Sequence, residues 1–533
     1  MTKRRPIDYT DAEWFADGIN MIDCDNGFAL NIMSDDMSSR EAMIKAVSDY
    51  MDYMCNGTKV TDMTFAIFGQ SSAVDCKTMG WVYRNSEKVI DKWLSPDNPY
   101  PPEKVKRYVN YTKVYHALED FDIDWAEVAA SECRKRGVRP WMYLRMNDLH
   151  GVDIDFSIFH DPFFFKAREN GWLNGNPVYG RPRGTSGSIE NLYEFSHPEV
   201  REWMLTYIEE MMMRYDVFGF GFDFMRNIYC IDYLRAEPGY QKYMTEFMRR
   251  VKEIRDRAEK KHGHSIKIMS RLSHTVEDNF IYGFDVKQWI EEGLVDMLVP
   301  GCEEVCNSGV DVKEWRDVVG EDFPLLIGYD DHIARWADAG AEFIYQVKPE
   351  HIKAFTAKYY NLGMNGTYSN NFYAPFNVRF VKDIDRESAN EGLRTFVVTH
   401  QDITPIGRTP YKPLPIDLSL SGGSAEIDIN IGTVKEGEYL YLTVGYDKTG
   451  VRDVGVTLSG HAPVGVTEVP IVYDKITGHY YNEDYTFLKS DTLLRYAFEG
   501  ISGSDDLIVR FSLPGADFNI VYIELSATPD KIE

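Results

Sequence analysis

The sequence predicts an α/β protein, namely a (β/α)8 TIM barrel followed by an all-β antiparallel sandwich of jelly-roll type. Two observations lead to this fold class. Between about residues 28 and 375, short apolar runs alternate with amphipathic helical stretches, which is the pattern of repeated βα units around a parallel sheet. Beyond residue 415, apolar and polar residues alternate with period two between Gly-rich turns, as they do in short antiparallel strands.

Eight apolar runs are the expected barrel strands, because eight parallel strands with intervening helices close into a barrel. A helix is predicted over residues 285–293, where a glycine ends it before the sixth run, and a last helical stretch is expected near residues 387–399. The eight runs cover residues 28–33, 63–68, 139–145, 217–224, 266–271, 296–299, 324–329 and 363–368.

A Pro-rich segment at residues 409–415 separates two expected domains. Residues 1–408 are the predicted barrel domain, and residues 409–533 are the predicted sandwich. The barrel exceeds the usual length of about 250 residues, and the excess lies in long loops after strands two and three. Both loops are rich in aromatic residues, including Trp81 and Trp172. These either form the walls of a cleft or only pack the loops onto the barrel.

The charge of the chain argues against nucleic acid or a membrane as a partner. There are 58 Lys and Arg against 84 Asp and Glu, which gives a formal net charge of -26 at pH 7 and repels phosphate backbones and anionic lipids. The sequence contains no run of 18 or more apolar residues, which is the length a helix needs to span a bilayer. Aromatic residues make up 14% of the chain, which suits stacking on sugar rings.

The cysteines and the N-terminal residues bear on the compartment. Seven widely spread cysteines without a C-x-x-C pair predict thiols rather than a disulfide framework or a zinc site. The first 20 residues lack the apolar stretch of a secretory signal. We therefore expect a cytoplasmic protein, or a secreted one if a signal peptide was removed, and a homo-oligomer is compatible with the sequence.

The fourth predicted strand carries the most informative pattern. Successive strand residues face opposite sides, so the phenylalanines at 218, 220, 222 and 224 share one side, and Gly219, Gly221 and Asp223 share the other. The phenylalanines suit the layer under the helices. Asp223 then faces the barrel axis at the carboxyl end of the strand, above two glycines that we expect to keep the lumen open. In an alternative interpretation, Asp223 only neutralises a buried arginine, which would be Arg145, Arg226 or Arg271.

Other predicted strands also end in acidic residues. Strand one is expected to end in Asp35 and Asp36, strand six in Glu303 with Glu304 following it, and strand seven in Asp330. Because barrel enzymes keep their active sites at the carboxyl ends of the strands, we expect these side chains to converge.

Two carboxyl groups that face one pocket are what the cleavage of a glycosidic bond requires, one ionised and the other protonated. We expect an arginine beside Asp223 to keep it ionised as the nucleophile or base. The less polar surroundings of Glu303, next to Gly301 and Cys302, favour this residue as the acid, with Glu304 in reserve. The other expected site residues bind substrate, and they are Asp36, Trp81, Arg145, Asn147, Trp172, Arg226, Arg271, His274, Asp330, Tyr368 and Asn370.

Two segments carry a resemblance to a known family. Residues 219–226, Gly-Phe-Gly-Phe-Asp-Phe-Met-Arg, and the passage Trp-Ile-Glu-Glu-Gly-Leu-Val-Asp within residues 285–300 resemble glycoside-hydrolase-like TIM-barrel proteins. The fourth strand of those proteins typically reads Gly-x-x-x-Asp-Phe-x-Arg, and their passage into strand six reads Trp-Ile-x-x-Gly-x-Val-Asp. The likeness covers roughly residues 217–304.

This part of the chain is also similar to the wider group of α-galactosidases and α-glucosidases. The resemblance implies that Asp223 is the nucleophile and that the acid follows strand six, as Glu303 or Glu304. Strand six of that group usually ends in Asp, so this chain departs from the pattern there. A β-sandwich after the barrel also fits these enzymes.

Two other classes of protein stay open. One is a carbohydrate-binding barrel without catalysis, and the other is a different barrel enzyme, such as a lyase or a metal-dependent hydrolase. The strand ends carry no His-x-His metal motif, although Asp35, Asp36 and Asp330 could hold a divalent cation. No Gly-rich phosphate loop occurs, and we expect no organic cofactor and no resident metal. The expected partner is a carbohydrate substrate.

Overall fold

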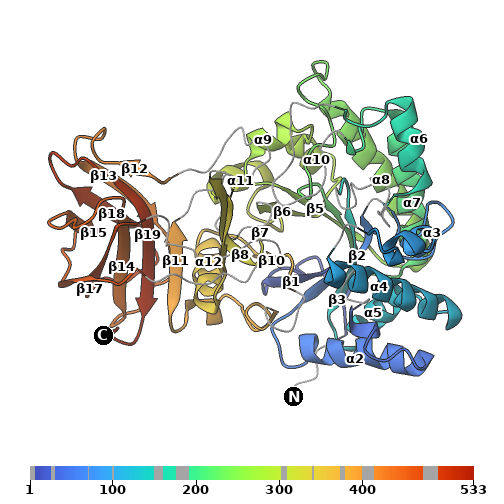
Figure 1. Cartoon of the computed structure of the whole chain (residues 1–533), viewed down its shortest axis with the longest axis horizontal. Coiled ribbons are helices and arrows are strands. Elements are labelled where there is room, and N and C mark those ends of the chain that lie inside the picture. Colours follow the sequence, from blue (N-terminus) through green and yellow to red (C-terminus); the bar gives the residue numbers. More distant parts are fainter. Residues whose placement is uncertain are drawn as a thin grey trace. The chain divides into compact units, whose positions relative to one another are not determined.

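The structure is a computed structural model that describes residues 6–25, 31–69, 71–98, 101–148, 160–175, 191–301, 306, 309–338, 341–372, 378–398, 413–471 and 490–532. The chain divides into two compact units (Figure 1). The first unit comprises Met1–Gly301, Lys313–Gly328 and Tyr368–Val378, and the second comprises Cys302–Val312, Tyr329–Thr367 and Arg379–Glu533.

Eight strands close into a parallel barrel in the order β1-β10-β7-β6-β5-β4-β3-β2 (Figure 1). The predicted TIM barrel is confirmed, and seven of the eight predicted runs overlap its strands. The strands are β1 (Ile19–Cys24), β2 (Asp62–Gly69), β3 (Arg139–Arg145), β4 (Gly219–Asp223), β5 (Lys267–Ser273), β6 (Met297–Gly301), β7 (Leu326–Tyr329) and β10 (Gly366–Ser369).

Helices follow most of these strands, as the alternating pattern predicts. Side-chain caps begin several of them, since Asp124 accepts from the second and third backbone N–H groups of α5 and Asp285 caps α10, the helix predicted from residue 285. None of the helices within the described residues is long and apolar enough to cross a membrane. The helices are α2 (Arg40–Cys55), α3 (Val82–Leu94), α4 (Pro102–Asp120), α5 (Trp125–Lys135), α6 (Pro162–Asn170), α7 (Pro198–Arg214), α8 (Gln241–His262), α9 (Val276–Ile281), α10 (Val286–Glu291), α11 (Val312–Val319) and α12 (Pro349–Asn361).

The prediction of the first strand is wrong. The strand lies earlier in the chain, at Ile19–Cys24, where it pairs with β2 in the register Asp23↔Thr64. Within the predicted run 28–33, residues 31–33 are helical. Consequently Asp35 and Asp36 do not end a strand, and both are exposed. The run Ile-Asn-Met-Ile-Asp-Cys forms the strand because all six residues are buried between the barrel lumen and the helices.

The two glycines of β4 do not keep the lumen open. Each lies opposite a large residue of β3, in the pairs Trp141↔Gly219 and Tyr143↔Gly221. A Cβ atom on Gly219 would lie 2.3 Å from the ring of Trp141, and one on Gly221 would lie 2.8 Å from the ring of Tyr143. The glycines therefore make room for these aromatic rings, which fill the lower barrel.

Trp14, which precedes β1, packs against this aromatic layer. Its ring centroid lies 6.0 Å from that of Trp141 and 5.2 Å from that of Phe218. Phe218 thus belongs to the lumen cluster, the buried group of side chains around Trp14, Trp141, Tyr143 and Met269, and not to the layer under the helices. Phe224 contacts Phe284 beside α10, as the strand parity predicts.

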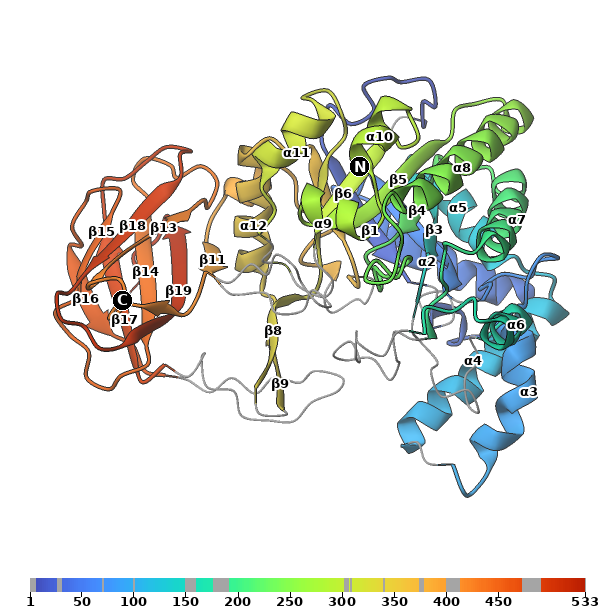
Figure 2. The same ribbon diagram turned by 90° about the horizontal axis from the view of Figure 1, so that it is seen from above.

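The second unit contains a two-sheet antiparallel β-sandwich, as predicted (Figure 2). One sheet has the order β11-β19-β14-β17-β16, with β12 paired to β19, and the other has the order β13-β18-β15. Its strands are β11 (Arg394–Val398), β12 (Ile416–Asp417), β13 (Ser424–Ile429), β14 (Tyr439–Tyr446), β15 (Gly455–Leu458), β16 (Gly465–Glu468), β17 (Thr492–Phe498), β18 (Leu507–Ser512) and β19 (Asn519–Thr528).

Two elements of the second unit differ from the sequence prediction. The expected helical stretch near residues 387–399 is a short 3-10 helix at Ser388–Asn390 followed by β11, which pairs with β19 over its whole length. A hairpin of β8 (His332–Asp338) and β9 (Ala341–Gln346) lies between β7 and α12 and was not predicted.

Candidate active site

Asp223 ends β4 and is fully buried. Oδ1 accepts hydrogen bonds from the backbone N–H groups of Met225 at 2.9 Å and Arg226 at 3.0 Å, and Oδ2 accepts from Nη1 of Arg271 at 3.1 Å. Arg271 lies opposite Asp223 on β5, and the preceding residue of the same parity, Met269, belongs to the lumen cluster. Asp223 therefore faces the barrel axis, as predicted, and its donors are those of a carboxylate, which only accepts hydrogen bonds.

Asp23 is a second buried carboxyl group at the carboxyl end of a barrel strand. It follows Ile19 and Met21 in the lumen-facing parity of β1. Oδ1 accepts from Oγ1 of Thr64 at 2.9 Å, while Oδ2 is buried and accepts no hydrogen bond from any described residue. A carboxyl oxygen buried without a donor favours the protonated form.

The surroundings of Asp23 raise its pKa to about 7. Burial is the largest cause, and the negative charges of Asp25 and Asp223 add to it, whereas the positive charge of Arg145 and the hydrogen bond from Thr64 oppose it. Near neutral pH, a large fraction of Asp23 therefore carries a proton. Asp23 and the Asp223–Arg271 ion pair both lie at the carboxyl ends of the barrel strands, which we call the barrel mouth.

Arg145 lies at the end of β3 between two further carboxyl groups. Nη2 is 3.4 Å from Oδ2 of Asp25, and Nη1 is 3.6 Å from Oδ2 of Asp148. Burial alone would lower the pKa of Arg145, but these two carboxylates and Asp23 raise it well above its ordinary value. These described side chains bring four carboxyl groups together with two guanidinium groups, a balance that suits a neutral or positively charged ligand better than an anion.

Two tyrosines complete the layer beneath these charges. The ring centroids of Tyr143 and Tyr368 are 6.0 Å apart, and the guanidinium carbon of Arg271 lies 5.7 Å from the Tyr368 ring centroid. Burial raises the pKa of both hydroxyls well above the ordinary value, and the charges of Asp223 and Asp23 add to the shift. Both hydroxyls are therefore neutral and can donate hydrogen bonds.

The structure brings several of the sequence-predicted residues together at this mouth. Asp223, Arg145, Arg271 and Tyr368 lie there, and the backbone N–H of Arg226 binds Asp223. The predicted acids Glu303 and Glu304 lie outside the described residues. They follow directly after β6, which ends at Gly301.

Asn147 and His274 are buried next to the strand ends, and both form hydrogen bonds with the protein itself. Nδ2 of Asn147 donates to the carbonyls of Tyr193 and Tyr229, and its Oδ1 accepts from the backbone of Tyr193. The amide therefore joins two loops and has no N–H left for a sugar hydroxyl. The carbonyl of His274 accepts from the indole of Trp315.

The two tryptophans expected to stack on sugar pack against the protein. Trp81 is 5% exposed, and its ring lies edge-on to Tyr83 at 4.9 Å. Trp172 is half-buried and stacks on Phe163 at 5.9 Å. Packing of the long loops, the alternative that the sequence left open, accounts for these contacts.

The remaining predicted residues lie in different surroundings. Asp36 is exposed and accepts from the backbone of Ser38, and Asn370 is buried directly after β10. Asp330 belongs to the second unit, where it groups with Asp331 and His332, the ligand atoms of the three lying within 4.8 Å of one another. Three such groups form a cluster that could hold a metal ion.

Sequence reasoning missed Asp23, Asp25 and Asp148. Asp23 and Asp25 were missed because the first strand was predicted at residues 28–33 and not at Ile19–Cys24. Asp148 follows the correctly predicted β3 and falls outside the strand parity of Arg145 and Asn147. A usable signal exists: the run Ile19 to Cys24 carries Asp23 in its lumen-facing parity, just as β4 carries Asp223.

No family model and no curated protein matches the chain. Among solved structures, the chain is similar to a cycloisomaltooligosaccharide glucanotransferase from Paenibacillus sp., with a TM-score of 0.35 and 9% identity over 97% of this chain and 58% of that one. It is also similar to the chitinase ChiW from Paenibacillus sp. str. FPU-7, with a TM-score of 0.37 and 10% identity over 94% of this chain and 56% of that one. A GH36 alpha-galactosidase from Geobacillus stearothermophilus is similar with a TM-score of 0.33 and 11% identity, over 93% of this chain and 55% of that one.

These structures are therefore carbohydrate-active enzymes, and two of the three are glycoside hydrolases. This chain spans little more than half the length of each. At these identities and TM-scores, the likeness assigns the chain neither a family nor an activity.

Proposed function

We propose that the chain is a glycoside hydrolase that cleaves an oligosaccharide or glycoside at the carboxyl ends of its barrel strands. One observation carries the proposal: two buried carboxyl groups in the same mouth have opposite environments. Asp223 accepts three hydrogen bonds, one of them from Arg271, while one oxygen of Asp23 accepts none from the described part of the chain and the pKa of Asp23 is about 7. Such a contrast separates a base or nucleophile from an acid.

In this proposal, Asp223 is the nucleophile or base, and a protonated carboxyl group donates to the departing oxygen. The sequence proposes Glu303, with Glu304 in reserve, for the acid. The structure adds Asp23, whose proton is retained near neutral pH. An excess of carboxylates also suits the reaction, because the transition state of glycoside cleavage carries positive charge on the sugar. Arg145, Tyr143 and Tyr368 would bind sugar hydroxyls.

The experiment is hydrolysis of a panel of aryl glycosides by the full-length chain, with both anomers of each common sugar. The variants are Asp223→Asn, Asp23→Asn and Glu303→Gln. Replacing the nucleophile or the acid should lower kcat/KM by about 10²- to 10⁴-fold. If Asp23 is the acid, kcat/KM of the parent chain also falls as the pH rises above about 7, and this fall is absent in Asp23→Asn.

The matched control is Asp296→Asn. Asp296 accepts from Nη1 of Arg255 at 3.1 Å and precedes β6, at the opposite end of the barrel from the mouth. It therefore tests the loss of an Asp–Arg pair without touching the site. Full turnover by Asp223→Asn would remove the proposal.

A carbohydrate-binding barrel without catalysis is the second candidate. It is favoured by the fact that both oxygens of Asp223 already have protein donors and that the side chain is 1% exposed. Isothermal titration with the same sugars distinguishes the two, because this candidate predicts binding without turnover.

A further inference from the structure

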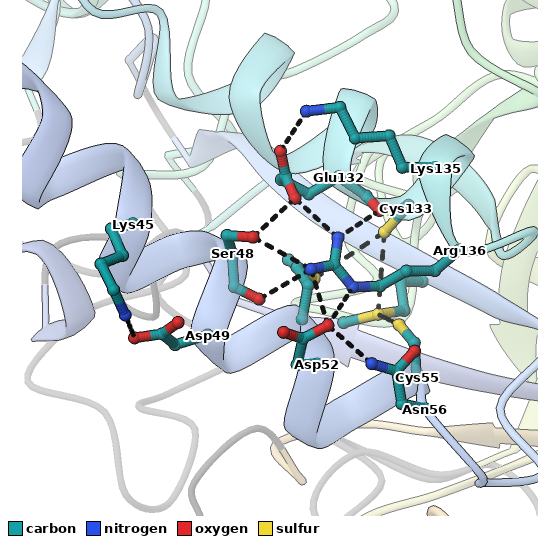
Figure 3. A network of polar contacts seen from close by, with 12 residues as sticks. Lys45, Ser48, Asp49, Asp52, Cys55, Asn56, Glu132, Cys133, Lys135 and Arg136 are labelled. Atoms are coloured by element: carbon teal, nitrogen blue, oxygen red, sulfur yellow. Dashed lines mark hydrogen bonds and ion pairs between the residues drawn. The ribbon is translucent and has the colours of Figure 1, made fainter. Parts of the chain in front are cut away.

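Four buried sulfur atoms meet between β2 and the helices α2 and α5 (Figure 3). The thiol of Cys55 lies 3.7 Å from the thioether of Met63, and the thiol of Cys133 lies 3.8 Å from Met63 and 3.9 Å from the thioether of Met51. The exposed fraction of each residue is 1% or less. The side chains of Cys55 and Cys133 also share a hydrogen bond. After burial, this bond is the next largest cause that raises the pKa of Cys133.

The three sulfur–sulfur distances of 3.7, 3.8 and 3.9 Å each match one edge of a tetrahedral metal–sulfur site. Sulfur atoms at the corners of a tetrahedron with edges of about 3.8 Å lie about 2.3 Å from its centre, which is the metal–sulfur bond length of tetrahedral thiolate sites. The two cysteines lie 78 positions apart in the sequence, so their spacing gives no sign of a shared site.

The ligand set selects the metal. Two thiols with two thioethers are soft ligands, which favour Cu(I), whereas zinc sites use thiolate, imidazole or carboxylate ligands. We propose that this cluster, Met51, Cys55, Met63 and Cys133, is a binding site for one Cu(I) ion. Binding releases the thiol protons to solvent and leaves copper in the same oxidation state.

A polar network holds the two helices that supply the ligands. The guanidinium of Arg136, just after α5, donates to the carboxylates of Glu132 and Asp52 and to the side chain of Ser48 on α2 (Figure 3). Its positive charge acts on Cys133 in the direction that lowers the thiol pKa, against burial. Arg136 therefore compensates part of the negative charge that two thiolates would bring to the site.

The position of Cys55 offers a route for the ion. It is the last residue of α2, and the next two residues, Asn56 and Gly57, are exposed. Fraying of one helical turn would expose Cys55, since helix ends open at low cost.

The test is anaerobic titration of the reduced, full-length chain with Cu(I) in competition with the chelator bicinchoninate. One equivalent should bind, with copper–sulfur distances near about 2.3 Å by X-ray absorption. Met63→Leu conserves the volume of the core, and Cys133→Ala removes a thiolate. Each variant should bind at least about 100-fold more weakly, because loss of an outer partner of a metal ligand already costs 10- to 100-fold. Cu(I) should also raise the Tm of the parent chain but not that of the variants.

The control is Cys230→Ala, which removes a buried thiol after β4 that makes none of these sulfur contacts. It should bind Cu(I) like the parent chain. The proposal is overturned if the parent chain binds no Cu(I) in this competition, or if Met63→Leu and Cys133→Ala both bind it unchanged. If Cys133→Ala fails to fold, Met63→Leu decides.

Discussion

Asp23 couples the stability of the barrel to pH. Its pKa rises from 3.8 to about 7 on folding, mainly through burial. Between these two values the folded chain binds more protons than the unfolded chain, so this residue makes the free energy of unfolding fall as the pH rises. Its stabilising contribution is complete below pH 3.8 and is lost once the pH has passed about 7.

Asp23→Asn should therefore be more stable than the parent chain at pH 8 and about equally stable at pH 4. The neutral amide replaces a buried carboxylate, one oxygen of which accepts no hydrogen bond from the described residues. The difference in Tm between the two proteins, measured by calorimetry from pH 4 to 8, checks this. Burial also raises the pKa of Glu194 to about 7. Glu194 therefore gives both proteins the same dependence of Tm on pH, and its effect cancels in the difference. A variant that unfolds at a lower temperature at pH 8 would contradict the account.

At the scale of single elements, β4 shows how a neighbouring strand constrains a sequence. Gly219 is required because the ring of Trp141 and the carbonyl of Lys267 would lie 2.3 Å and 2.7 Å from an added Cβ atom. The second of these neighbours is backbone and cannot rotate away. The Gly-x-Gly spacing is thus a property of lumen packing and not of an open cavity.

Gly219→Ala should destabilise the first unit by about 1–3 kcal/mol, the usual cost of overpacking a filled core. Chemical denaturation measures this free energy of unfolding. The double variant Gly219→Ala with Trp141→Leu should be less destabilised than the two single changes would give together, because the smaller side chain makes room. Strict additivity would show that the contact with Trp141 is not the cause.

The barrel strands could largely be predicted from the sequence, since buried parallel strands are short apolar runs with a recognisable spacing. β3 is predicted at its observed bounds. β1 was missed, because periodicity alone does not separate a strand of six residues from a nearby apolar helical turn. β11 was mistaken for a helix because its pairing with β19 joins residues more than 120 positions apart.

The candidate site was only partly predictable for a related reason. Strand parity placed Asp223 and Arg271 correctly at the barrel mouth, because the alternation of side chains is local. The pKa of Asp23 is raised by burial and by the negative charges of Asp25 and Asp223, and these surroundings form only when the barrel closes.

At the scale of the whole molecule, each compact unit has its own buried core and its own buried ion pairs. In the second unit, Arg394 on β11 binds Glu438 through two hydrogen bonds of 3.0 and 2.9 Å, with both side chains at most 6% exposed. Removing one partner leaves the other charge buried without compensation.

Arg394→Met should therefore destabilise the second unit by about 3–5 kcal/mol. The pair lies within the sandwich, so calorimetry should show that the unfolding transition assigned to this unit moves, while the transition reported by the barrel tryptophans does not. The double variant with Glu438→Leu should recover much of the loss, since a buried pair is often replaceable by apolar residues. An unchanged second transition would contradict the assignment.

The central claim is that the barrel mouth keeps one carboxyl group protonated near neutral pH beside another in an ion pair. It is tested most directly by titrating the side-chain carboxyl signals of ¹³C-labelled aspartate in the full-length chain by NMR. The account predicts one aspartate with a midpoint near pH 7, which disappears in Asp23→Asn and persists in Asp296→Asn. If Asp23 instead titrates near its ordinary value of 3.8, the mouth holds no acid of this kind and the account fails.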